Sequence, residues 1–245
     1  MQATKGYSMA GKSLFVGLPA YDFKVSLKLA MSLARFAQMA PQHGVDINIG
    51  SICGCSVVSR ARNLLVKDML DADADYLMFI DSDINFKPED IFRLMAWAQD
   101  SKKGIVAGMP RIREVNKSYV ADLDYDENGD LTMNGMGLVR AKRVPTAFML
   151  IQRSVITDMM AAHPDWTYLD KRCDKEVPAL FDFKLTEEGY IGEDFLFCDR
   201  ARELGYEVWI DPTITLGHMG VQEYEGNFGD DILYPMFAPP KKDAA

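Results

Sequence analysis

Short runs of consecutive apolar residues alternate with segments of helical periodicity through the first half of the chain. Continuous apolar runs at 14–18, 76–80 and 104–109 predict strands that are buried on both faces. Residues 45–52 alternate between apolar and polar and predict a half-buried strand. Segments 25–39 and 60–70 repeat their apolar residues at helical spacing, and a third helix is expected from Pro88, with acidic residues in its first turn.

The second half of the chain predicts a less regular arrangement. An Asn128–Gly129 turn within 122–131 indicates a hairpin. Further strands are expected at 147–151 and 208–210, with helices at 154–162 and 193–204. We therefore expect an α/β fold: a doubly wound, mostly parallel central sheet flanked by helices, with a small antiparallel hairpin region. Residues 1–224 are expected to form one domain, and 225–245, rich in Gly, Pro and charge, a mobile tail or lid.

Composition narrows the class of function. The chain has 245 residues, 48% of them hydrophobic, and a formal net charge of -9, which disfavours general binding to duplex nucleic acid. No apolar run is long enough to span a bilayer, and the N-terminus has no signal-peptide pattern, so a cytoplasmic location is expected. The four cysteines lack zinc-ligand spacing and are expected to be free thiols.

Two carboxylates follow the predicted strand 76–80. Asp81 and Asp83 lie two positions apart at its end, so their side chains point the same way. Ligands of open α/β sheets bind at the carboxyl ends of the strands. Carboxylate oxygens suit Mg²⁺ or Mn²⁺, which bridge diphosphate oxygens. Taken alone, such a pair is also compatible with a solvated strand end.

Three other segments carry candidate chemistry. Arg62–Asn63 lies one helix upstream and could meet the acidic strand end or a nucleotide phosphate. Glu193 and Asp194 open a predicted helix, where an acid either caps the helix or accepts a proton from an acceptor hydroxyl. His218, between two glycines and after a strand expected to lie beside 76–80, is a candidate third metal ligand.

Basic and acidic clusters elsewhere have simpler explanations. Arg111 and Arg113 could rim the cleft, and Arg140, Lys142 and Arg143 are typical of a solvated face. Asp124-x-Asp126-x-Asn128-Gly129 is similar to the start of a calcium-binding EF-hand loop. Gly135 stands where that loop needs Glu, so a hairpin turn explains the segment better.

The order of these motifs resembles the GT-A glycosyltransferases over about residues 14–220. The donor half of that superfamily is similar to Ala61–Arg62–Asn63 followed by 75–83. Its acceptor half is similar to Gly192–Glu193–Asp194–Phe195, then Arg200, Gly205 and Gly217–His218.

The resemblance implies a metal-dependent transfer of a sugar from a nucleotide-diphosphate sugar, a UDP- or GDP-sugar, to an acceptor hydroxyl, with Mn²⁺ or Mg²⁺ as the cofactor. It assigns the metal to Asp81, Asp83 and His218, and acid or base chemistry to Asp194 and Glu193. The donor would contact a set of residues from two strand ends and one helix: Pro19, Ala20, Tyr21, Arg62, Asn63, Asp81 and Ser82. Inversion and retention at the anomeric carbon both remain open.

Other functions stay open at this point. A haloacid dehalogenase-like phosphatase also has Asp-x-Asp after an apolar strand, although on its first strand. A sugar nucleotidyltransferase needs a glycine-rich phosphate loop, which 18–24 lacks. A non-catalytic nucleotide-sugar-binding module would keep the same motifs without turnover. The acceptor could be a glycan, a protein, a small molecule or a modified nucleobase, and the sequence leaves the oligomeric state open.

Overall fold

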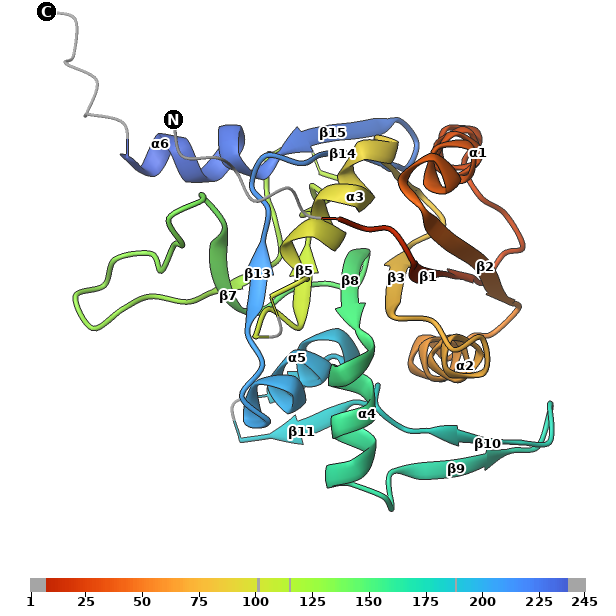
Figure 1. Ribbon diagram of the computed structural model, residues 1–245. Coiled ribbons are helices and arrows are strands. Elements are labelled where there is room, and N and C mark those ends of the chain that lie inside the picture. The colour runs from red at the N-terminus through yellow and green to blue at the C-terminus, as the bar shows by residue number, and fades with distance from the viewer. Residues whose placement is uncertain (1–7, 101, 115, 188, 238–245) are drawn as a thin grey trace, which may run out of the picture.

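A computed structural model describes residues 8–100, 102–114, 116–187 and 189–237. At its centre lies a sheet of eight strands, counted within these ranges, in the order β2-β1-β3-β8-β5-β13-β7-β6 (Figure 1). Only β8 and β7 run against the direction of the others. The predicted α/β fold with a mostly parallel central sheet is thus confirmed. The strands are β1 (Lys12–Ala20), β2 (Val45–Cys53), β3 (Tyr76–Ile80), β5 (Ile105–Ala107), β6 (Asp122–Leu123), β7 (Val139–Arg143), β8 (Phe148–Gln152) and β13 (Val208–Ile210).

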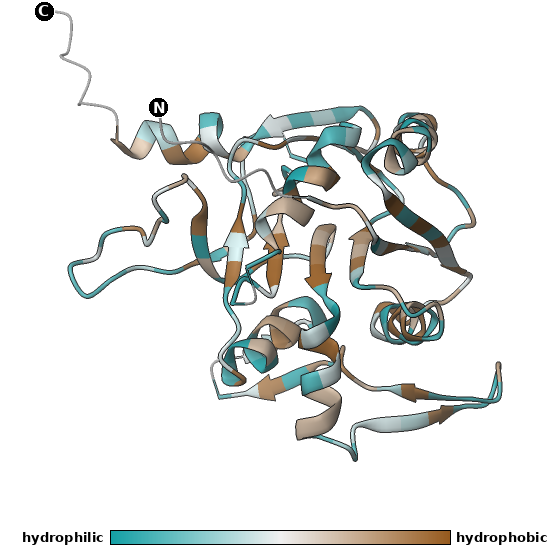
Figure 2. Cartoon of the chain, viewed as in Figure 1, coloured by the Kyte–Doolittle hydropathy of each residue, from teal (hydrophilic) through white to brown (hydrophobic). Residues whose placement is uncertain are grey.

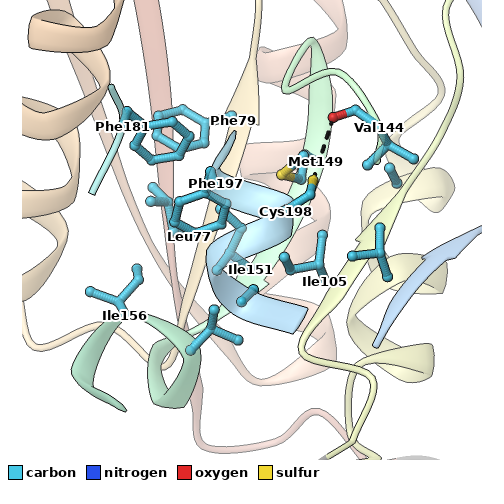
Figure 3. Packing of buried hydrophobic residues seen from close by; sticks show 14 of the residues in the cluster. Leu77, Phe79, Ile105, Val144, Met149, Ile151, Ile156, Phe181, Phe197 and Cys198 are labelled. Carbon is cyan, nitrogen blue, oxygen red and sulfur yellow. Dashed lines mark hydrogen bonds between the residues drawn. The ribbon is translucent and has the colours of Figure 1, made fainter. Parts of the chain in front are cut away.

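Helices cover both faces of this sheet, each above its own apolar cluster. On one face α1 and α3 pack over a cluster that includes Leu29, Phe36 and Ile91. On the other, α2, α4 and α5 pack over a cluster around Phe181 and Phe197, whose rings stack at 4.3 Å (Figure 3). Between the two helical layers, β5 and β8 are brown in Figure 2, which marks them as hydrophobic. The helices are α1 (Leu27–Met39), η1 (Ala40–His43), α2 (Val58–Asp71), α3 (Pro88–Trp97), α4 (Arg153–Ala162) and α5 (Glu193–Glu203).

Strand β3 is buried because its sequence has no polar residue to present to solvent. Leu77, Met78, Phe79 and Ile80 are all fully inaccessible, packed between the two helical layers. Helix α3 begins at Pro88 as the sequence predicts. The carboxylate of Asp90 accepts a hydrogen bond from the amide of Lys87, closing the first turn. The end of β3 is therefore fixed between two packed layers.

One neighbour relation differs from the sequence prediction. The strand at Trp209 was expected beside the Asp81 strand, but β8 and β5 lie between β13 and β3. Strand β8 is apolar from Phe148 to Ile151, and an apolar run does not encode the direction in which its strand enters the sheet. Here it enters antiparallel, next to β3.

Short antiparallel ladders complete the fold. A three-stranded one joins β4 (Ile84–Asn85), β14 (Thr215–Met219) and β15 (Glu223–Asn227). Two hairpins pair β9 (Thr167–Asp170) with β10 (Lys175–Pro178), and β11 (Lys184–Thr186) with β12 (Gly189–Ile191). The predicted turn at Asn128–Gly129 is also present, flanked by a bridge between Tyr125 and Leu131. All four cysteines are free, as predicted.

Up to Phe237, the segment expected to be a mobile tail or lid has regular secondary structure. After Tyr224 the chain completes β15, then forms a π-helix (Gly229–Leu233) and α6 (Tyr234–Phe237). Phe228 and Leu233 are buried in the core cluster. The glycine content had indicated a loop, but Gly229 allows close packing: a Cβ there would lie 2.6 Å from the carbonyl oxygen of Pro212. Residues 238–245 of the predicted tail lie outside the described residues.

In the described part of the chain, no helix combines the length and the apolar character needed to cross a membrane.

A buried ion pair ties α2 to the β9–β10 hairpin and generates a stability prediction. The guanidinium of Arg60 donates two hydrogen bonds, 2.6 and 2.7 Å long, to the carboxylate of Asp170. This contact lowers the pKa of Asp170 to about 2, against the opposing effect of burial. Because the folded-state pKa is depressed, the stabilisation is present above pH 4 and is lost as the pH falls towards 2.

We expect Asp170→Asn to lower the free energy of unfolding by about 2 kcal/mol at neutral pH. Urea titrations between pH 7 and pH 2 should show this difference shrinking as Asp170 becomes protonated. Asp165→Asn, at an exposed position of the same region, is the control and should change little. A difference that stays constant down to pH 2 would contradict the assigned pKa.

Candidate functional site

A cavity of about 780 Å³ opens at the carboxyl ends of β1, β2 and β3. The three strands are parallel neighbours, so the loops that follow them meet at one edge of the sheet. The lining comes from the ends of these strands and the loops after them, from α2, from Arg113 between β5 and β6, and from the end of β14. The residues are Pro19, Ala20, Tyr21, Asp22, Lys24, Val25, Ser26, Ile52, Cys55, Ser56, Val58, Ala61, Arg62, Asp81, Ser82, Asp83, Arg113, Met219 and Gly220. Most of the residues proposed from the sequence for the donor and the metal line this cavity.

Asp83 and His218 meet although 135 positions separate them in sequence. Strand β14 pairs with β4, directly after Asp83, and the ladder brings Nε2 of His218 to 3.4 Å from Oδ2 of Asp83. His218 thus lies on a strand, where the sequence had predicted a loop. Burial opposes both charges, but the contact outweighs it: the pKa of Asp83 is lowered and that of His218 is raised.

The other ring nitrogen of His218 is fixed by the backbone. Nδ1 lies 2.8 Å from the carbonyl oxygen of Arg111, and a carbonyl only accepts, so Nδ1 carries the proton. In the neutral ring, Nε2 then has the free lone pair and faces Asp83. Metal-binding histidines usually have this arrangement, with the distal N–H bonded to a carbonyl or carboxylate.

Asp83 and His218 therefore fit a divalent metal as a mixed oxygen and nitrogen pair. Within the described residues, no three His, Cys, Asp or Glu side chains form a group that could hold a metal unaided. A metal at this pair would take its remaining ligands from water or from a diphosphate, as Mg²⁺ commonly does. Asp81 faces the same cavity, and burial raises its pKa despite the nearby charge of Arg62.

Arg62 is buried between two carboxylates. It lies on α2, its side chain is 7% exposed, and it makes ion pairs with Asp81 at 3.5 Å and with Glu193 at the start of α5. Glu193 is itself buried. One guanidinium therefore holds the end of β3 and the first turn of α5 in a fixed relation, and leaves Glu193 committed to a cation.

Four residues proposed for the site do not line the cavity: Asn63, Glu193, Asp194 and His218. Asn63 is buried and faces the segment before β11: its amide donates to the carbonyl of Phe181 at 2.9 Å and accepts from the Phe181 N–H at 2.8 Å. Asp194 accepts from the Phe195 N–H at 2.8 Å, within the first turn of its own helix. Consecutive side chains on a helix point in different directions, so Asn63 faces away from the cavity that its neighbour Arg62 lines. The sequence prediction had assigned both residues to the site.

Some lining residues were missed in the sequence. Cys55 and Ser56 follow β2, which is parallel to β1. Because ligands bind at the carboxyl ends of parallel strands, this position alone could have indicated them as lining residues. Arg113 was considered only as a rim residue. It reaches the centre, with Nη1 3.0 Å from Oδ2 of Asp83 and 3.2 Å from the carbonyl oxygen of Met219.

Comparisons with known proteins find similarity only in structure. No protein-family model matches the chain, and no curated protein matches it. GalNAc-T7, crystallised with UDP, GalNAc and Mn²⁺, aligns with a TM-score of 0.47 and 10% identity over 85% of this chain and 44% of that one. TarS of S. aureus, residues 1–349 with UDP-GlcNAc, aligns with a TM-score of 0.43 and 16% identity over 81% and 56%.

The same part of TarS without that ligand gives a TM-score of 0.45 and 16% identity over 82% of this chain and 58% of that one. These proteins are GT-A glycosyltransferases, the group that the sequence motifs resemble. This chain spans about half of the length of these structures. Similarity at this level is limited to parts of the fold and does not extend to this chain's substrate.

The placement of Asn63 gives a test that separates a structural role from donor binding. Asn63→Ala leaves the buried amide and carbonyl of Phe181 without partners, so we expect the free energy of unfolding to fall by about 2 kcal/mol. Nucleotide affinity should stay within about twofold, since the Asn63 side chain is turned away from the cavity. Asn48→Ala, at an exposed strand position, is the matched control. Unchanged stability with lost nucleotide binding would restore Asn63 to the site.

Proposed function

We propose that this chain is a metal-dependent glycosyltransferase that moves a sugar from a nucleotide-diphosphate sugar to an acceptor hydroxyl. One observation carries the proposal. Asp83 lies on a cavity of about 780 Å³ that also contains Arg62 and Arg113. At the carboxyl end of the central strand Asp83 meets His218, which is held in the Nδ1–H form. Carboxylate, imidazole and guanidinium groups together suit a metal-bound diphosphate.

Asp83 and His218 are the residues that would hold Mn²⁺ or Mg²⁺. Bound there, the ion offsets the charge that develops on the leaving diphosphate. Arg113 adds a second positive charge, because its guanidinium already lies against Asp83 and can turn to phosphate oxygens instead. Asp81 is close enough to Arg62 to be oriented by it and is proposed to accept a hydrogen bond from the donor ribose.

The donor's nucleoside is proposed to lie between the loops after β1 and β2. Pro19, Ala20 and Tyr21 line one side, and Cys55 and Ser56 the other. Tyr21 is 65% exposed and offers an aromatic face to a base. The cavity volume is in the range of sites for ligands of nucleotide size. Both UDP and GDP remain candidates.

Asp194 is the stronger of the two candidates for the base. Glu193 is buried in an ion pair with Arg62 and serves to position that guanidinium. Asp194 is half-buried on the first turn of α5, one residue further along. If the transfer inverts the anomeric carbon, Asp194 would accept the proton of the acceptor hydroxyl. The acceptor itself remains one of a glycan, a protein, a small molecule or a modified nucleobase.

The phosphatase alternative is less well supported by the arrangement of the sheet. Its acidic pair belongs on the first strand, whereas Asp81 and Asp83 follow β3, the third strand of the chain. A non-catalytic nucleotide-sugar-binding module would use the same cavity and differs only in the absence of turnover.

The metal role of Asp83 can be measured by titration calorimetry of UDP and GDP with and without Mn²⁺. We expect one nucleotide to bind in a metal-dependent manner, and Asp83→Ala to weaken that binding at least about 10-fold. Asp130→Ala, an exposed acid on the hairpin turn, should leave it unchanged. Equal affinity with and without metal would contradict the proposed site, and hydrolysis of simple phosphate esters would favour the phosphatase.

The proposed diphosphate contact of Arg113 predicts a different pattern. Arg113→Gln should weaken binding of the nucleoside diphosphate about 10-fold and of the corresponding monophosphate much less, because the charge-assisted hydrogen bonds go to the second phosphate. Lys171→Gln, an exposed cation elsewhere, controls for net charge. An equal loss for both nucleotides would place Arg113 away from that phosphate.

A further inference from the structure

The segment 111–113 contributes two groups to the site from one loop. Its Arg111 carbonyl accepts from Nδ1 of His218, and its Arg113 guanidinium contacts Asp83. Both contacts come from a stretch between β5 and β6 whose described residues, 108–114 and 116–121, form no helix or strand. Such a loop presents these groups accurately only if other elements hold it.

Hydrogen bonds close this loop on itself. The amide of Ile112 donates to the carbonyl of Ser118 at 2.8 Å. The guanidinium of Arg111 donates to the carbonyl of Glu114 at 2.9 Å. The position of 111–113 is therefore tied to the position of 117–119.

Asp231 holds residues 117–119 in place through two contacts. The hydroxyl of Tyr119 donates to Oδ2 of Asp231 at 2.6 Å, and Lys117 forms an ion pair with the same carboxylate. The Asp231 side chain is only 5% exposed. Tyr119 also packs edge-on against Phe228 at 5.4 Å. Burial and the Asp231 charge raise the pKa of Tyr119, so its hydroxyl keeps the proton that it donates.

Gly226 on β15 leaves the space in which these groups meet. A Cβ there would collide with the Tyr119 hydroxyl, and would lie 2.9 Å from the Asp231 carboxylate and 3.1 Å from Cβ of Arg111. Tyr119, Asp231 and Arg111 thus all lie close to Gly226. Gly226 is on β15, which pairs with β14, the strand of His218.

We propose that Asp231 and Tyr119 are positioning residues for the site: they hold 117–119, and through it 111–113, so that the Arg111 carbonyl fixes the His218 ring and Arg113 reaches Asp83. The part of this proposal that concerns His218 stands on the contacts alone, whereas its effect on nucleotide affinity rests on the proposed function. The segment that was expected to be a mobile tail would then set the geometry of the site.

The matched variants are Tyr119→Phe and Tyr206→Phe. Each removes one tyrosine hydroxyl that donates to an aspartate. Tyr206, in the turn between α5 and β13, donates to Asp158 of α4 at 2.5 Å, away from the cavity. In Tyr119→Phe the remaining phenyl ring can still pack on Phe228, so the fold should persist, and thermal unfolding should show similar losses in the two variants.

The first readout is the tautomer of His218 in the metal-free protein, measured by ¹⁵N NMR of the three histidines, with His218→Gln for assignment. Above the imidazole pKa, we expect the Nδ1–H form in the wild type and in Tyr206→Phe, and a mixture of tautomers in Tyr119→Phe. An unchanged Nδ1–H form in Tyr119→Phe would overturn the proposal, whatever the chain's substrate.

The second readout is the affinity for UDP and GDP in the presence of Mn²⁺. We expect Tyr119→Phe and Asp231→Asn each to weaken binding about 10-fold, with Tyr206→Phe unchanged. The double variant should lose less than the product of the two single losses, because both act through one contact. Equal effects of Tyr119→Phe and Tyr206→Phe would overturn the proposal. If neither nucleotide binds the wild type, the proposed function fails. The NMR result still tests whether Tyr119 positions the segment that fixes His218.

Discussion

A guanidinium buried between two carboxylates holds the site together. Arg62 is on α2, Asp81 ends the central strand β3, and Glu193 opens α5, so one side chain links three elements from distant parts of the chain. Burying these charges is costly unless they remain paired, and removal of one partner leaves the others exposed to that cost. The two ion pairs of Arg62 therefore fix the geometry at the end of β3. A surface ion pair of the same composition would contribute much less to positioning.

A second set of contacts orients the groups of the proposed metal site. The β14–β4 ladder places His218 beside Asp83, and the carbonyl of Arg111 selects which imidazole nitrogen faces it. The side chains of His218 and Asp83 alone do not determine which imidazole nitrogen faces the carboxylate. The site is thus formed by a rigid part, the ends of the parallel strands, and by a loop that depends on β15 and the π-helix for its position.

The sequence predicted the elements well wherever one physical signal dominated. The apolar run of β3, the proline at the start of α3 and the glycine-containing turn at Asn128–Gly129 each have a local cause, and each was found. The pair Asp81 and Asp83 was located for the same reason, since strand ends follow from apolar runs.

What could not be predicted depends on contacts between distant residues. The direction of β8 is not encoded in its composition, and so the neighbours of β3 were misassigned. The segment after Tyr224 was taken for a tail because glycine favours loops locally, whereas here Gly226 and Gly229 admit close packing. Asn63 shows the same limit within one helix: its neighbour Arg62 faces the cavity, and it does not.

The most direct test of the account is pulsed electron paramagnetic resonance of Mn²⁺ bound together with UDP or GDP to ¹⁵N-histidine-labelled protein. The account predicts a ¹⁵N coupling to the manganese from one imidazole, which disappears in His218→Gln while nucleotide binding persists more weakly. Mn²⁺ bound with the nucleotide but without any histidine coupling would contradict the metal site at Asp83 and His218, and with it the proposed role of the cavity.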